Sequence, residues 1–177
     1  MRRFIVIALL LTIIIVFFLF SDSGLQAIQG IADSNQDASW APLVYYDIAN
    51  LHAVAGRHER SIEVYDVILN TYWYESKDKY VENKYGEYYA AYALFYNAET
   101  LERIAKSRID EAYRAQQDGD IETYKTLRVE SVGLYQDARI AYKDFMSYFG
   151  LIHELYSNAN SRQSKLVDTI YEIAQGN

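Results

Sequence analysis

The chain has 177 residues, a formal net charge of -7 and no cysteine. The acidic charge argues against a nucleic-acid partner, because phosphate binding requires an excess of Lys and Arg on one face. The missing cysteines exclude disulfides, thiolate catalysis and cysteine-ligated metals. One proline and eight glycines supply too few turns for a β-sandwich of this length, so we expect an all-α fold.

The first two dozen residues, MRRFIVIALLLTIIIVFFLFSDSG, indicate a membrane-targeting segment. An apolar run begins at Phe4 and ends at Phe20, and as a helix it would span roughly 25 Å, just under the ~30 Å hydrocarbon core. Arg2 and Arg3 precede the run, which favours a cytoplasmic N-terminus. We therefore expect residues 1–24 to be a single-pass anchor in the cytoplasmic membrane, with the rest of the chain extracytoplasmic.

The alternative for this segment is a cleaved signal peptide. Ser21 and Ser23 are small residues in the relation that a signal peptidase accepts, which would release a secreted or periplasmic protein after cleavage near Ser23. The apolar run is longer than the ~7–15 residues of an ordinary signal-peptide core, and this favours the anchor. A buried helix of a globular protein is disfavoured, because no polar face interrupts the run.

Residues 25–39 are small, polar and mildly acidic. They predict a linker that carries a short helical extension through Ile31. From Trp40 the apolar spacing becomes helical and stays so, which makes residues 40–177 the expected helical domain.

The first unit of this domain predicts an antiparallel helical hairpin. Ser39 is the expected N-cap and Pro42 lies in the first turn, where a missing N–H costs little. Gly56 marks the turn between two helices. The first helix has apolar spacing of three and four at Tyr45, Ile48, Ala49 and His52, and the second at Ile62, Tyr65, Ile68, Leu69 and Tyr72.

This unit resembles a tetratricopeptide repeat, a hairpin of ~34 residues with the pattern W-x2-L-G-x2-Y and then A-x3-F. The matching positions are Tyr45, the pair Ile48-Ala49, Gly56, Ser61 and Tyr65. The chain departs from the family at His52, where the family prefers tyrosine, and it lacks the closing proline. The resemblance implies an array of helical hairpins in which small residues let helices approach closely.

The second half predicts a longer, less regular hairpin. A helical pattern covers residues 87–117, Asp118-Gly119-Asp120 signals a turn, and Asp120 is the expected cap of the next helix. The stretch GLYQDARIAYKDF, which begins at Gly133, resembles the second half of a tetratricopeptide hairpin, so the turn register stays open between Gly119 and Gly133. A last helix over residues 152–174 would be the terminal cap of the array.

No sequence motif for catalysis is present. The three histidines, His52, His58 and His153, do not form a metal-binding pair on one helix face, and we interpret the first as packing and the other two as solvated. Phosphate-binding loops, nucleophile elbows and haem-attachment motifs are missing as well. We therefore expect no catalytic residue, metal, cofactor or small-molecule substrate.

Tyrosines are concentrated between residues 72 and 96. They fit an aromatic core, a recognition surface rich in the side chains that anchor interfaces, or a membrane-interface belt. The acidic stretch nearby disfavours the last. The partner-binding residues that we predict on the concave face are Tyr45, Ile48, His52, Tyr88 and Tyr92.

Two functions fit these observations. The first is a membrane-anchored scaffold that binds another protein outside the cytoplasmic membrane and contacts the bilayer through the apolar run. The alternative is a structural accessory subunit of a larger integral-membrane complex, in which that run packs against other membrane helices.

Overall fold

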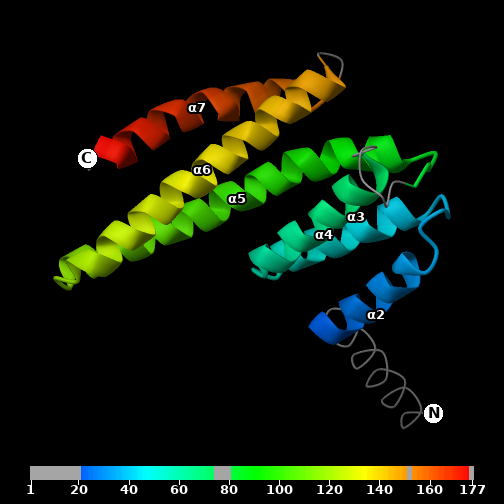
Figure 1. The fold of residues 1–177 in the computed structure, drawn as a ribbon, viewed down its shortest axis with the longest axis horizontal. Helices are drawn as coiled ribbons and strands as arrows, with labels where there is room; N and C mark the ends of the chain where they lie inside the picture. The colour runs from blue at the N-terminus through cyan, green and yellow to red at the C-terminus, as the bar shows by residue number, and fades with distance from the viewer. Residues whose placement is uncertain (1–20, 74–80, 151–152, 176–177) are drawn as a thin grey trace, which may run out of the picture.

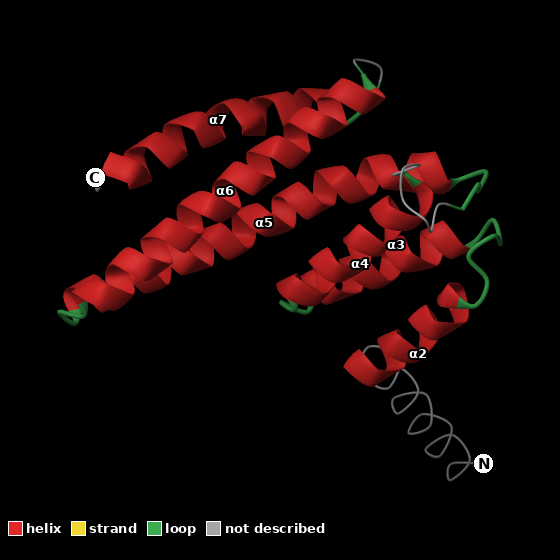
Figure 2. Ribbon diagram, in the orientation of Figure 1, coloured by secondary structure: helices red, strands yellow, loops and turns green. Residues whose placement is uncertain are grey.

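The computed structural model describes residues 21–73, 81–150 and 153–175. These residues form six helices and no strand, which confirms the all-α prediction for this part of the chain (Figure 2). The helices are α2 (Asp22–Asp33), α3 (Ala41–Val54), α4 (His58–Tyr72), α5 (Gly86–Gln117), α6 (Ile121–Phe149) and α7 (Tyr156–Gln175).

The helices form a stack in chain order (Figure 1). Each helix packs on the next one along the chain, and α3 also contacts α5. The α5/α6 hairpin is about twice the length of the α3/α4 hairpin and extends well beyond it in Figure 1. The core therefore runs along the stack as a continuous seam between neighbouring helices.

Helix α2 occupies most of the segment that the sequence predicts to be a linker. Its N-cap is Ser21, whose side chain accepts a hydrogen bond from the Gly24 backbone N–H at 3.1 Å. Leu25 and Ala32 are buried against α3. The segment is thus an ordered, packed helix, because its few apolar residues recur at helical spacing among small polar ones.

The α3/α4 hairpin turns at Gly56, whose φ of 75° favours glycine. Ala49 and Ser61 are fully buried and leave room for close helix packing. Pro42 lies in the first turn of α3 as expected. The prediction of Ser39 as the N-cap is wrong, because the helix begins one residue later than expected. Trp40 is the N-cap residue, and its side chain makes no capping hydrogen bond.

The α5/α6 hairpin settles the turn that the sequence leaves open. Gly119 has a φ of 81° and joins the two helices, whereas Gly133 lies inside α6. Asp120 caps α6 by accepting a hydrogen bond from the Thr123 N–H at 3.1 Å, as predicted. The two long helices are therefore one hairpin with its tip at Gly119.

The predicted membrane segment lies outside the described residues. Within the described ranges, no helix is long and apolar enough to cross a bilayer. The apolar run from Phe4 to Phe20 lies outside these ranges, and its role as a membrane anchor stays a prediction.

Candidate protein-binding surface

Three of the five predicted partner-binding residues lie in the core. Tyr45 is fully buried, Ile48 is 2% exposed and His52 is 1% exposed. These three residues therefore do not lie on a surface that a partner can reach, which corrects the prediction. Helix α3 is enclosed by α2, α4 and α5 and presents little free surface at these positions. The sequence shows one apolar face of α3, but a helix in the middle of a stack is covered on several sides.

Tyr45 joins the N-terminal helix to the hairpin. Its hydroxyl donates a hydrogen bond to Asp33 Oδ1 at 2.6 Å, and its ring lies 6.3 Å from that of Tyr72. Burial and the bond to Asp33 raise the pKa of the Tyr45 hydroxyl well above its ordinary value. The residue is therefore a neutral donor that fixes α2 on α3.

The other two predicted residues belong to a partly exposed aromatic cluster, which we call the tyrosine surface. It consists of Tyr46 from α3 and Tyr88, Tyr89, Tyr92 and Tyr96 from the first turns of α5. Their ring centroids lie between 5.0 and 6.4 Å apart, the range of favourable aromatic pairs. Tyr88 is 54% exposed, and the other four rings are half-buried beneath and beside it.

A chain of hydroxyl groups orders this surface. Tyr88 donates to the Tyr92 hydroxyl at 3.3 Å, and Tyr92 donates to Glu154 Oε1 at 2.5 Å. The bond to Glu154, followed by that to Tyr88, raises the pKa of Tyr92 above its ordinary value. The first turns of α5 are thereby connected to the segment between α6 and α7.

His153 supports the same surface from below. Its ring lies 5.2 Å from that of Tyr92 and 5.0 Å from that of Phe145. The interpretation of His153 as solvated is therefore wrong, because the segment before α7 folds it against aromatic rings. Neither Glu154 nor His153 could be found from sequence spacing, since both reach the surface through a tertiary contact.

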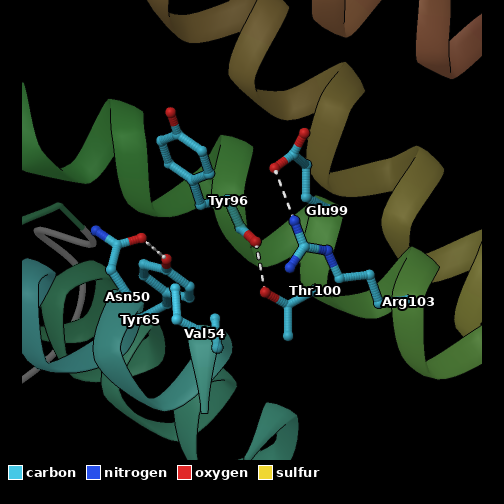
Figure 3. Close-up of a pocket in the computed structure, with 8 residues that line it drawn as sticks. Asn50, Val54, Tyr65, Tyr96, Glu99, Thr100 and Arg103 are labelled. Atoms are coloured by element: carbon cyan, nitrogen blue, oxygen red, sulfur yellow. Dashed lines mark hydrogen bonds and ion pairs between the residues drawn. The ribbon is translucent and has the colours of Figure 1, made fainter. Parts of the chain in front are cut away.

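A small pocket between the α3/α4 hairpin and α5 shows no arrangement of side chains typical of a catalytic site (Figure 3). Its volume is about 210 Å³. Tyr65 donates to Asn50 Oδ1 at 2.8 Å, and Thr100 donates to the Tyr96 carbonyl at 2.8 Å. These two hydroxyl groups are thus engaged within the fold.

The acidic residues near this pocket are engaged as well. Arg162 of α7 reaches Glu99 at 2.6 Å and Glu102 at 3.2 Å, and the Tyr142 hydroxyl donates to Glu102 at 2.5 Å. Such a network links three helices and holds both carboxylates in ion pairs. Across the residues that the structure describes, no group of three or more His, Cys, Asp or Glu side chains is placed to hold a metal ion.

Comparison with known proteins gives no relative. No protein-family model matches the chain, and neither a curated protein nor a solved structure matches it with statistical significance. The resemblance to tetratricopeptide repeats therefore rests on the sequence pattern of the first hairpin.

Proposed function

We propose that this chain is a membrane-anchored, non-catalytic interaction module, an irregular tetratricopeptide-like array that binds another protein outside the cytoplasmic membrane. The anchor is the apolar run that ends at Phe20. The hairpin turn at Gly56 and the buried small residues Ala49 and Ser61 support the repeat-like part of the proposal. The stack of paired helices is a suitable scaffold, because such arrays present extended surfaces.

The tyrosine surface is the observation that carries the proposal. Tyr88 and its neighbours place aromatic rings and hydroxyl groups together at the surface, and tyrosine is enriched among the residues that dominate interface energies. The hydrogen bonds from Tyr88 to Tyr92 and on to Glu154 hold the rings in place before binding. A preordered surface loses less side-chain freedom when a partner docks.

Site-specific photocrosslinking tests this surface in the full chain in its own membrane. A photoreactive phenylalanine at Tyr88 should crosslink a discrete partner. Tyr88→Ala should lower co-purification of that partner by about tenfold or more, the effect of losing ~1.4 kcal/mol at an interface. Tyr92 is unsuitable as the first probe, because its hydroxyl bridges two segments of the fold.

Tyr171→Ala is the matched control, since Tyr171 is 63% exposed but lies on α7. Both variants should keep the wild-type melting temperature. Undiminished co-purification by the Tyr88 variant, or an equal loss in both variants, would overturn the assignment of the tyrosine surface.

Two further measurements address the membrane part of the proposal. Intact-mass spectrometry of the mature protein should find the N-terminal residues present; a mass that begins near Ser23 would mean a released protein. Native sizing after mild detergent extraction should give a species in which the partner dissociates on dilution. Stable comigration with integral-membrane subunits would assign the accessory role instead.

A further inference from the structure

A second surface, an open groove, lies between α4 and α6 with α5 as its floor. Its volume is about 580 Å³, within the ~300–1,000 Å³ of ordinary ligand sites. Its lining is predominantly apolar. The apolar side chains are Ile62 of α4, Ile104 of α5 and Leu134 of α6. None of these residues belongs to the tyrosine surface.

Acidic residues form both walls of this groove. Glu59 and Glu63 stand on the α4 wall, and Glu130 and Asp137 stand on the α6 wall. All four are exposed. The single basic residue in the lining is Arg108, which lies 3.0 Å from Glu111 and 3.9 Å from Glu130.

Two of these carboxylates have no counter-charge among the described residues. Glu63 pairs with Arg60 at 2.6 Å and Glu130 faces Arg108. In the part of the chain that the structure describes, Glu59 and Asp137 take part in no ion pair or hydrogen bond. The groove therefore combines an apolar floor with uncompensated negative charge on opposite walls.

Gly133 lies in this groove and has no packing role in the described fold. It stands inside α6, where glycine costs ~0.5–1 kcal/mol relative to alanine. A Cβ atom built on it meets no atom within 4 Å. Its missing side chain leaves the α6 backbone accessible from the groove, as is required where another chain approaches a helix closely.

We propose that this groove is the docking site for a basic amphipathic helix of another protein, with apolar residues inserted between α4 and α6 and Lys or Arg residues facing the two walls. Helix-in-groove recognition uses anchors at positions i, i+3 or i+4, and i+7. The α6 wall from Glu130 to Asp137 has that same seven-residue span, about 10 Å of helix. The incoming helix would complete a layer on α5.

Charge selects this occupant over a second copy of the same chain. None of the described helices carries a net positive charge, counting histidine as neutral. A second copy would therefore bring neutral or acidic helices against acidic walls, which like-charge repulsion opposes. A cationic helix gains Coulomb attraction that also speeds its encounter with the groove.

The test measures binding of a synthetic helical peptide to the full chain in nanodiscs of neutral phosphatidylcholine. The peptide carries leucine on one face and lysine on the other, with a fluorescent label for anisotropy. Its counterpart has glutamate in place of every lysine, and empty nanodiscs give the background. We expect saturable binding of the lysine peptide only, weakening as salt is raised.

Two pairs of variants locate the binding. Gly133→Trp fills the groove and should weaken binding of the lysine peptide about tenfold or more, whereas Gly133→Ala adds a single methyl group and should weaken it much less. Glu59→Lys with Asp137→Lys should have a similar effect to Gly133→Trp. Asp168→Lys with Glu172→Lys makes the same change in net charge at exposed positions on α7 and should have little effect.

Equal binding by the two groove variants and their controls would overturn the proposal, as would equal binding of both peptides. A dimer in sedimentation that Gly133→Trp dissociates would show that a second copy occupies the groove instead. Circular dichroism of each variant verifies folding, and the charge-reversal pair keeps the test decisive if Gly133→Trp does not fold. Crosslinking at Tyr88 is unaffected by this outcome, so the two surfaces are tested independently.

Discussion

His52 is a buried histidine whose Nδ1 atom makes no hydrogen bond and lies 3.8 Å from Asp22 Oδ1. Burial, and then the neighbouring charge of Arg57, lower its pKa below the ordinary 6.5, and Asp22 opposes this shift only in part. The imidazole is therefore neutral in the folded protein at neutral pH. It belongs to α3 and faces α2, the helix that follows the predicted anchor.

This histidine predicts a loss of stability on acidification. The unfolded chain takes up a proton on His52 below about pH 6.5, whereas the folded chain takes it up only at a lower pH. Between those two pKa values the unfolded state binds more protons, so the free energy of unfolding falls as the pH falls. In His52→Gln, denaturant unfolding from pH 7 to pH 5 should show a smaller fall than in wild type.

The control for this measurement is Val54→Ala, because Val54 is 86% exposed at the end of the same helix and does not titrate. Its pH dependence between 7 and 5 should match that of the wild type. Identical pH dependence of wild type and His52→Gln would show that Asp22 compensates the charge of a protonated His52 fully.

At the scale of the elements, Arg162 joins α7 to α5 of the long hairpin. Arg162 reaches Glu99 and Glu102 on α5, and Tyr142 of α6 shares Glu102. Burial, followed by the bond to Glu102, raises the pKa of Tyr142, which stays a neutral donor. Both carboxylates are largely shielded from solvent. Removing the arginine should therefore destabilise the protein more than removing one from an exposed ion pair.

We predict that Arg162→Met loosens α7 selectively. Amide hydrogen exchange should become faster in α7, because Glu99 and Glu102 lose their shared counter-charge. Arg60→Met is the matched control, since the Arg60–Glu63 pair has both side chains more than half exposed and such pairs contribute little. Unchanged α7 exchange in the Arg162 variant would mean that apolar packing alone holds this helix.

Local signals in the sequence predict the ends of several helices well. The pattern over 87–117 and the cap at Asp120 correspond closely to α5 and to the start of α6, because both depend on residues near in sequence. The packing of α2 and the burial of Tyr45 could not be read in the same way. Both depend on which helices contact one another. The apolar periodicity of a helix indicates its buried face but does not indicate which helix covers that face.

The two candidate surfaces also differ in whether they depend on residues near in sequence or on contacts between distant helices. The prediction of Tyr88 as a binding residue depends on a local signal, the spacing of tyrosines along one helix. The acidic groove has no such signal, since its walls come from α4 and α6, which are about 70 residues apart along the chain. From the sequence, Gly133 is a possible turn and the first residue of a stretch that resembles half of a tetratricopeptide hairpin. Its place in the groove follows from the hairpin closing at Gly119.

At the scale of the whole molecule, the order of the helices in space follows their order in the chain (Figure 1). Helix α7 packs mainly on α6, and α2 packs mainly on α3 at the other end of the stack. In such arrays each unit is stabilised by its neighbours, and opening can spread from one end. The destabilising effect of a substitution at one end should therefore decrease from helix to helix along the stack.

Leu166→Ala tests this at the C-terminal end, because Leu166 is 3% exposed on α7. Removing a buried leucine side chain costs roughly 2–5 kcal/mol. Hydrogen exchange should become much faster in α7, moderately faster in α6 and unchanged in α2 and α3. Val167→Ala, at a position 45% exposed on the same helix, should leave all four helices near wild type. A uniform increase across the six described helices would show that the stack unfolds as one cooperative unit.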